Sequence, residues 1–269
     1  MIKRLFSLSA VVLLLTGNVM YAQQYRVQVD VTKQEPIQLS NVLSSFSFEE
    51  LSSDELLKIQ DNVHRIELNK YFPSIVNKKN YLSNPLDNSY INKFVEKRDS
   101  VIIHFVPSDT IFILDKSTRK ISPWIVIDFG EKGYKDNLSL LSNEMYKKYV
   151  TSHYKYAGYI ENVALFDSVL FFTYRYNDEI VQVLFNMATN HCLNGKIVDD
   201  LFSQFSNATL FNQAVSKVDR GIDIGYLMSF NLSNPMIKEL FPNVDVDSIK
   251  FVNKNNFNRM VLIPTFKNF

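Results

Sequence analysis

Cysteine is nearly absent from this sequence, with Cys192 the only one among 269 residues. A disulfide within the chain is therefore excluded, and no cysteine follows the amino-terminal apolar run to carry a lipid anchor. Adjacent residues of a strand point to opposite faces, so the neighbouring His191 is poorly placed to activate the thiol. We expect Cys192 to be buried and inert, and we expect the protein not to be a lipoprotein.

Glycine is also scarce, at 7 residues where an average content of about 7% would give more than twice as many. Turns that need a left-handed backbone must then be made by other residues. Asparagine tolerates this conformation better than other residues that carry a β-carbon. It recurs where turns are expected, at Asn162, Asn177, Asn186, Asn190, Asn194, Asn253, Asn255 and Asn256.

The sequence has no marked excess of positive or negative charge. Its 29 Lys+Arg nearly balance its 28 Asp+Glu, which gives a formal net charge of +1. A protein that binds nucleic acid needs a basic surface to neutralise phosphates, so we expect no nucleic-acid partner. The four histidines show no metal-ligand spacing, and there is no His-Glu-x-x-His, Cys-x-x-Cys, Gly-x-Ser-x-Gly or glycine-rich phosphate-binding motif. We expect no cofactor, no metal site and no catalytic residue.

Only one apolar run is long, and it lies at the amino terminus. Residues 5–15 follow Lys3 and Arg4 and precede the small residue Ala22, which is the order of an export signal. The run is about half of the ~20 residues that a membrane-spanning helix needs. We expect residues 1–22 to be a signal peptide, the protein to be periplasmic or extracellular, and the remainder to contain no stable transmembrane segment.

Alternating apolar and polar residues predict β-strands in most of the remainder. One strand is expected at the amino terminus over residues 25–31, and an apolar last strand over 260–263 is a candidate to pair with it. Between them, short turns join the strands as in antiparallel meanders. The expected strands of these meanders are 101–105, 110–114, 121–129, 169–176 and 180–186. His104 lies inside the first of them, where we expect a hydrogen-bonded structural histidine.

Short helices are expected between the strands. Ser52 and Glu55 have the spacing of a capping box, residues 138–154 carry apolar residues at helical spacing, and Asn234 precedes Pro235 as a cap precedes a first helical turn. The segment 69–92 is rich in Asn, Ser, Lys and Pro with little apolar periodicity. It is expected to be an irregular connection.

A three-residue pattern recurs near expected strand starts: Asp, then Ser or Thr, then an aliphatic residue. It occurs at Asp99, Asp109, Asp167 and Asp247. An aspartate can close a turn by accepting a hydrogen bond from the backbone two residues on. The pattern is explained either by turn chemistry common to all-β proteins or by descent of repeated hairpins. It also resembles the O-glycan acceptor motif of gut-type Bacteroidetes, so glycosylation of these sites is left open.

Aromatic residues, 13% of the sequence, concentrate on the expected strand 169–176. Alternation places Phe172 with Tyr174 and Tyr176 on one face and Phe171 on the other. Together with Trp124, the two tyrosines could form a platform for sugar rings or pack as ordinary core.

Arg175 lies between the two tyrosines in the sequence, so its side chain is expected on the opposite face of the strand. It could line a central channel and bind an anionic group, or pair with Asp178 or Glu179 at the end of the strand. The candidate ligand-binding residues, all weakly indicated, are Arg175, Tyr174, Tyr176 and Trp124.

Several segments together resemble the six-bladed β-propellers that are common among exported Bacteroidetes proteins of unknown function. The resemblance is carried by 109–130, 156–160, 170–174 and 258–263, with 37–40 near the start, and the chain looks shortened relative to the family. It implies an all-β fold of propeller-like antiparallel meander blades, in a ring that can be incomplete, with a few short helices. The propeller-like domain would cover residues 23–269.

Two functions remain open on this basis. The first is a non-enzymatic ligand-binding or interaction scaffold of the bacterial cell envelope, with a glycan, a peptide or an envelope protein as its partner. The alternative is a carbohydrate-active hydrolase or lyase that uses two carboxylates about 5–9 Å apart on one propeller face. A paralogue that keeps the packing but has lost the site is a third interpretation, and the oligomeric state is left open.

Overall fold

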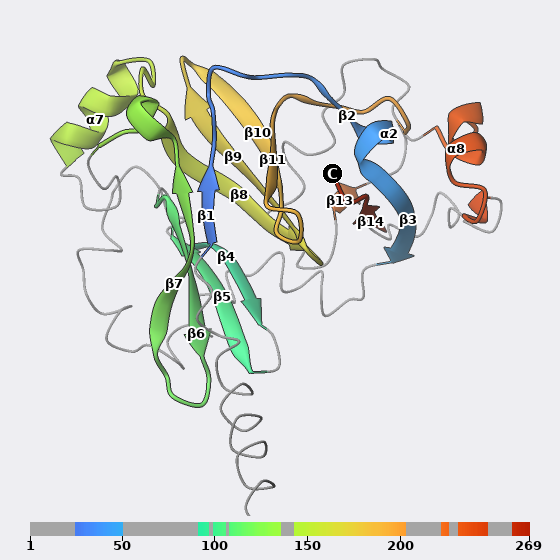
Figure 1. The fold of residues 1–269 in the computed structure, drawn as a ribbon, viewed down its shortest axis with the longest axis horizontal. Helices are drawn as coiled ribbons and strands as arrows, with labels where there is room; N and C mark the ends of the chain where they lie inside the picture. Colours follow the sequence, from blue (N-terminus) through green and yellow to red (C-terminus); the bar gives the residue numbers. More distant parts are fainter. Residues whose placement is uncertain are drawn as a thin grey trace, which may run out of the picture.

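The computed structural model describes residues 25–50, 91–96, 99–105, 108–135, 143–202, 222–225, 231–246 and 260–269. The expected signal peptide, the expected helix at Ser52 and nearly all of the segment 69–92 lie outside these ranges. Within them the protein is built mostly of antiparallel β-sheets with a few short helices (Figure 1). The all-β class is therefore confirmed, although the described sheets do not close into a propeller ring.

The first sheet has five strands in the order β1-β7-β6-β5-β4. Its main part is an antiparallel meander, as the short turns after residue 100 predicted. The meander strands are β4 (Ile91–Glu96), β5 (Ser100–Phe105), β6 (Thr110–Asp115) and β7 (Ile121–Asp128). β1 (Tyr25–Gln28) adds to the edge of β7 in the parallel direction, with Val27 opposite Ile127.

The second sheet has four strands in the order β11-β10-β9-β8, and all of its neighbours are antiparallel. The strands are β8 (Gly158–Phe166), β9 (Val169–Tyr176), β10 (Glu179–Asn186) and β11 (His191–Gly195). Asn177 and Asp178 join β9 to β10 with φ of 49° and 63°. Two successive left-handed residues match the right-handed twist of a hairpin, so this turn forms without glycine.

The expected pairing of the first and last strands is wrong. β14 (Met260–Phe266) lies between β3 (Leu43–Glu50) and β13 (Ile222–Gly225) in a three-stranded sheet. Both edges of β14 are therefore occupied, and β1 pairs with β7 instead. A further short parallel pair joins β2 (Ile37–Gln38) to β12 (Ile197–Val198).

The helices are short. They are α2 (Leu39–Val42), the 3-10 turn η1 (Gly130–Lys132), α7 (Asn143–Thr151) and α8 (Pro235–Leu240). α7 lies within the expected helical segment and is followed by His153 and Tyr154 in the left-handed conformation, which ends it. At α8 the side chain of Asn234 accepts a hydrogen bond from the Met236 amide, 3.1 Å away, so the predicted cap is confirmed.

The β8–β11 sheet is the middle of three layers, with the β1/β4–β7 sheet on one side and the β3/β13/β14 sheet on the other (Figure 1). Both of its faces are buried in hydrophobic cores. On β9, Phe171 belongs to the core shared with β3, while Phe172 and Tyr174 belong to the core shared with β7. The predicted alternation along this strand is therefore confirmed, and the rings serve as packing between sheets.

Asparagine replaces glycine at two of the predicted turns, where Asn177 and Asn190 have φ of 49° and 58°. Asn162 also has a positive φ, of 54°, but it lies within β8, next to a shift of strand register and not in a turn. Asn186 closes its turn differently, because its side-chain oxygen accepts the Ala188 amide at 2.9 Å. The positions from Asn253 onward lie outside the described residues.

At the second copy of the repeated pattern, the aspartate does not close its turn as expected. The Thr110 amide donates to the hydroxyl of Ser108 at 3.0 Å, and the Asp109 carboxylate accepts the Thr110 hydroxyl. Asp247 lies outside the described residues. The expected bond to the backbone two residues on is made by other aspartates, Asp30 and Asp115. Among these described aspartates, the bond is thus made outside the repeated pattern and not at Asp109.

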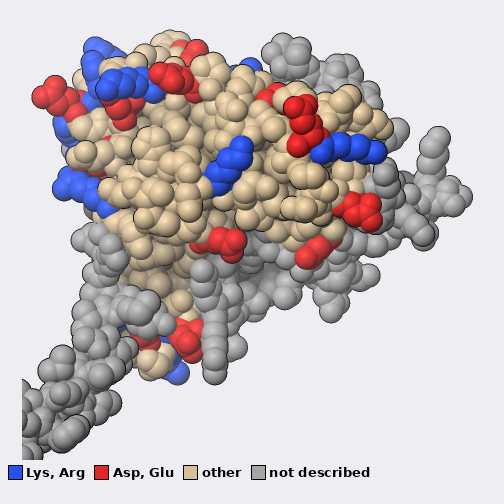
Figure 2. All heavy atoms as spheres, turned by 45° about the vertical axis from the view of Figure 1, so that its right-hand side comes forward, with Lys and Arg blue, Asp and Glu red and all other residues tan. Residues whose placement is uncertain are grey.

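The described surface is mixed in charge. On the face drawn in Figure 2, Lys and Arg side chains lie interspersed with Asp and Glu. Among the described helices, none is long and apolar enough to cross a bilayer.

Candidate functional site

Three of the predicted ligand-binding residues lie at the same core. Tyr174 has no exposed surface, while Trp124 and Tyr176 are half-buried at the margin of that core. The Trp124 ring meets the Tyr25 ring edge-on, with centroids 6.4 Å apart. Tyr174 is thus unavailable for stacking on a ligand, and a role for Trp124 and Tyr176 in binding stays a prediction.

Arg175 lies between Tyr174 and Tyr176 on β9, and its guanidinium is held by contacts of its own. Its Nη2 is 3.2 Å from Oε1 of Glu161, and its Cζ lies 5.3 Å and 5.7 Å from the ring centroids of Tyr154 and Tyr159. The guanidinium therefore combines an ion pair with cation–π contacts.

Of the two alternatives for Arg175, the pairing with Asp178 or Glu179 is wrong, because its ion pair is with Glu161. Glu161 lies on the adjacent strand β8, where the pairing with β9 shifts register on either side of it. Asp178 lies beyond the strand end and pairs with His153, Oδ2 to Nδ1 at 2.8 Å. The ion pair of Arg175 is therefore determined by its neighbour on the adjacent strand and not by the acidic residues that follow it in the sequence.

His104 is a structural residue, as expected. It is fully buried, and its Nε2 lies 2.9 Å from the carbonyl oxygen of Ser108, to which it donates. Burial lowers the pKa of His104 to about 4. The ring is therefore neutral at neutral pH.

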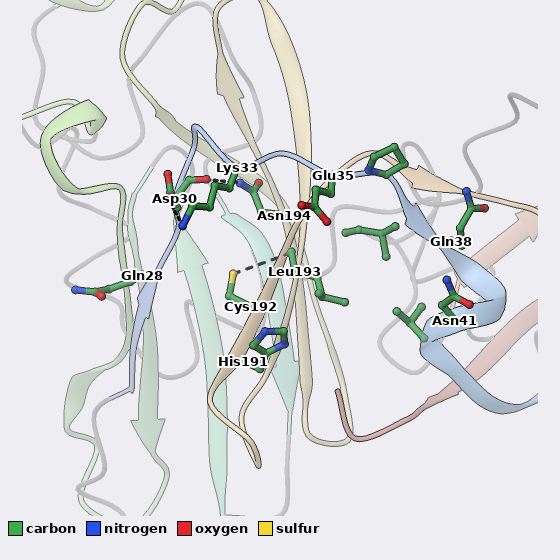
Figure 3. A pocket seen from close by; sticks show the side chains of 13 residues that line it. Gln28, Asp30, Lys33, Glu35, Gln38, Asn41, His191, Cys192, Leu193 and Asn194 are labelled. Atoms are coloured by element: carbon green, nitrogen blue, oxygen red, sulfur yellow. Dashed lines mark hydrogen bonds and ion pairs between the residues drawn. The ribbon is translucent and has the colours of Figure 1, made fainter.

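A groove of about 480 Å³ opens between β11, the segment from Gln28 to Gln38, and α2 (Figure 3). Its described walls carry amides, charges and a few aliphatic side chains. The lining residues are Gln28, Asp30, Lys33, Glu35, Pro36, Ile37, Gln38, Asn41, Val42, His191, Cys192, Leu193 and Asn194. The volume lies within the range of small-ligand sites.

Asp30 is held in a tight turn at the end of the groove. Its Oδ1 accepts the Thr32 hydroxyl at 2.6 Å and the Thr32 amide at 3.1 Å, and its Oδ2 lies 3.5 Å from Nζ of Lys33. The hydrogen bonds from Thr32, followed by the charge of Lys33, lower the pKa of this carboxyl. Asp30 is therefore an anion at neutral pH.

Asn194 ties the groove to the core beneath it. Its Oδ1 accepts the Tyr174 hydroxyl at 3.0 Å, and its Nδ2 donates to the Asp30 carbonyl at 2.9 Å. Its own carbonyl accepts the Glu35 amide at 3.0 Å. Burial raises the pKa of Tyr174 well above its ordinary value, so the phenol remains a hydrogen-bond donor.

Gly195 allows the two walls of the groove to meet. A β-carbon at this position would lie 1.9 Å from the carbonyl oxygen of Glu35. Any other residue would push the Glu35 segment away from β11. The absence of a side chain at Gly195 is thus a condition for the shape of the groove.

The Cys192 side chain is half-buried on the groove wall, and its Sγ lies 4.0 Å from the Leu193 carbonyl oxygen. Burial raises the pKa of the thiol to about 12. The side chain is therefore a protonated thiol at neutral pH, and His191 does not convert it into a nucleophile.

The groove brings two carboxylates, Asp30 and Glu35, onto one surface, but no Phe, Tyr or Trp ring is among its described lining residues. A smaller hollow of about 320 Å³ lies between residues 28–31 and residues 128–132. Among the described residues no group of three or more His, Cys, Asp or Glu is placed to hold a metal ion.

Sequence reasoning did not find this groove. Its walls come from residues 28–42 and 191–194, which are distant in sequence and carry no motif. The one local signal is the spacing of Asp30 and Thr32, which predicts a tight turn but not a ligand site.

Comparisons with known proteins add little. No protein-family model matches the chain, and no curated protein matches it. The chain is similar to the crystal structure of a Bacteroides fragilis protein that is provisionally described as exported, with 18% sequence identity and a TM-score of 0.35. The match covers 65% of this chain and 49% of the other, so the chain spans about half the length of that protein.

Proposed function

We propose that this protein is an exported, non-enzymatic binding scaffold of the bacterial cell envelope, and that the groove between β11 and residues 28–42 holds its ligand. In this proposal residues 1–22 direct export and residues 23–269 form one propeller-like unit. The stacked antiparallel meanders of the first two sheets support that architecture.

The observation that carries the proposal is the way the groove is fixed from below. Asn194 is buried and bonded on three sides, to Tyr174, to Asp30 and to Glu35. This network holds the floor of the groove, while Gln28 and Asn41 are exposed along it and Gln38 is half-buried. A rigid floor with exposed amide side chains suits recognition of a polar ligand, because little order must be gained on binding.

The hydrolase alternative is less well supported. A glycosidase needs one carboxyl with a raised pKa to donate a proton to the leaving group. Asp30 has the opposite shift, caused by its bonds from Thr32 and the charge of Lys33. The described lining also offers no aromatic platform for a sugar ring.

The test is a thermal-shift screen of the full mature chain against glycans, metabolites and peptide pools. A ligand of the folded state raises the melting temperature, since binding stabilises only the native form. The groove variant Asn41→Ala should abolish the shift, whereas Ser47→Ala, an exposed change on β3 outside the groove lining, should leave it intact.

Two results would contradict the proposal. Retention of the shift in Asn41→Ala together with a second groove variant, Gln38→Ala, would place the ligand elsewhere. Consumption of a glycan, lost in Asp30→Asn or Glu35→Gln, would establish catalysis in the groove in place of binding.

A further inference from the structure

We propose that the open edge of β11 binds an extended peptide as an added strand, with a basic side chain of that peptide beside Glu35. This inference rests on the proposed binding function of the groove and names the class of ligand. Three observations support it: the outward direction of the Cys192 backbone groups, the course of the Asp30–Lys33 turn, and the charge of the groove.

Among the described strands, β11 is at the edge of its sheet and pairs with β10 alone. In an antiparallel pair the residues alternate between facing the neighbouring strand and facing away from it. Asn194 faces away from β10, because its carbonyl accepts the Glu35 amide. Cys192, two residues earlier on the same strand, therefore also directs its N–H and C=O outward, and no described residue bonds to them.

The amino-terminal segment covers only part of this edge. Glu35 and Ile37 donate their amides to the carbonyls of Asn194 and Lys196, so the segment runs in parallel beside the end of β11. The chain joins the edge only after the turn in which the Lys33 amide donates to the Asp30 carbonyl at 3.0 Å, so its contact with β11 starts beyond Cys192, at Asn194. The groove occupies the place that this row of backbone leaves open (Figure 3).

The charge of the groove favours a basic peptide. Lys33 is paired with Asp30, so the negative charge of Asp30 is already balanced. Glu35 is exposed, and no ion pair joins it to a described residue. A lysine or arginine of the incoming strand would complement it across the groove.

The remaining walls suit the alternating side chains of a strand. Ile37, Val42 and Leu193 form an aliphatic side, while Gln28 and Asn41 offer amides. Residues on a strand point alternately to two sides, so an apolar side chain can meet the aliphatic wall while its neighbours reach the polar one. Main-chain bonds to an edge combined with side-chain pockets are the elements of strand addition.

The probe is a short synthetic peptide of alternating valine and lysine, titrated against the full mature chain by fluorescence polarisation. We expect saturable binding, about tenfold weaker for the matching valine–glutamate peptide. The valine–lysine peptide methylated on alternate backbone nitrogens should not bind, because it cannot pair with the edge. Hydrogen exchange should show the Cys192 amide becoming protected in the complex.

Variants of the protein test the same contacts. Cys192→Pro removes the outward donor and should weaken binding about tenfold, and proline is tolerated on an edge strand where the N–H faces away from the sheet. Cys192→Ala shortens the same side chain but keeps the donor, so it should bind more tightly than Cys192→Pro. Glu35→Gln should weaken binding of the lysine peptide, while the remote exposed change Glu179→Gln should not. If Cys192→Pro fails to fold, amide protection and the methylated peptide decide.

The inference is overturned if the valine–lysine peptide does not bind, if it binds without protecting the Cys192 amide, or if the glutamate peptide binds equally well. Concentration-dependent dimers that protect Cys192 without peptide would assign the edge to a second copy of the chain. A glycan or metabolite shift abolished by Asn41→Ala, without peptide binding, would overturn only this inference. If no glycan, metabolite or peptide binds the protein, the proposed function is overturned as well.

Discussion

The hydroxyl of Tyr174 donates to Oδ1 of Asn194 over 3.0 Å, and this bond joins the centre of the β8–β11 sheet to the floor of the groove. Tyr174 is fully buried and Asn194 is 8% exposed. A buried polar pair of this kind is stabilising only while both partners are present, because either group alone is left without a partner.

Tyr174→Phe should therefore destabilise the protein by about 1–2 kcal/mol, since the Asn194 oxygen loses its donor in a buried site. Urea unfolding followed by circular dichroism measures the change. The matched control is Tyr176→Phe, at a half-buried ring on the same strand, for which we expect a change below about 0.5 kcal/mol. Equal effects of the two substitutions would contradict the assigned role of the Tyr174 hydroxyl.

His104 should make stability depend on pH in mildly acidic solution. Burial lowers its pKa to about 4 from 6.5, partly opposed by the bond to Ser108. Between these values the unfolded chain binds a proton that the folded protein does not, so the free energy of unfolding falls as the pH decreases through this window. The loss from this group reaches about 3 kcal/mol near pH 4 and grows no further below it.

The measurement is chemical denaturation at a series of pH values, compared with the same series for His104→Gln. Glutamine can still donate to the Ser108 carbonyl but does not titrate. Subtracting the two series removes the contribution of the carboxylates. The same slope in both proteins would show that His104 does not titrate as described.

Gly195→Ala should disturb both stability and the groove. The new β-carbon would meet the Glu35 carbonyl at 1.9 Å, so a segment of backbone must move. We expect a loss of about 2–4 kcal/mol and faster hydrogen exchange of the Glu35 and Ile37 amides. The control is Gly130→Ala, where φ is +58° but nothing lies within 4 Å of the new carbon, and where about 1 kcal/mol is expected. A Gly130 effect as large as the Gly195 effect would rule out the steric explanation.

Asn234 should contribute to stability in two separable ways. Its Oδ1 caps α8 by accepting the Met236 amide, and its Nδ2 donates to the carbonyls of Asp200 and Leu201. Asn234→Ala removes both sets of bonds and should cost about 2 kcal/mol, whereas Asn234→Ser keeps an oxygen that can cap the helix, places no carboxylate against the two carbonyls, and should cost about half of that. Thermal unfolding distinguishes them, and equal losses would show that the cap does not contribute.

Local patterns in the sequence predicted much of the secondary structure. Alternation located β5, β6, β7, β9 and β10, and it placed Phe171 and Phe172 in different cores, because the period of a strand is fixed by its backbone. The cap at Asn234 and the left-handed turn at Asn177 were also predictable, since their hydrogen bonds and backbone angles involve only neighbouring residues.

The partners of Arg175 and of β14 were not predictable in the same way. Arg175 had acidic residues three and four positions later, yet its partner Glu161 comes from another strand and was brought near by the register of β8 on β9. β14 pairs with β3 and not with β1, although all three strands have suitable apolar residues.

Composition and periodicity thus decided the class of this protein, its short antiparallel hairpins and which side of each strand is buried, because these depend on interactions within a few residues. The order of the sheets, the meeting of residues 28–42 with β11 and the open backbone at Cys192 were decided only by tertiary packing. Such contacts join segments far apart in the chain, and many pairings satisfy the same local preferences. The candidate site belongs entirely to this second group, since its walls acquire a common surface only after the sheets have packed.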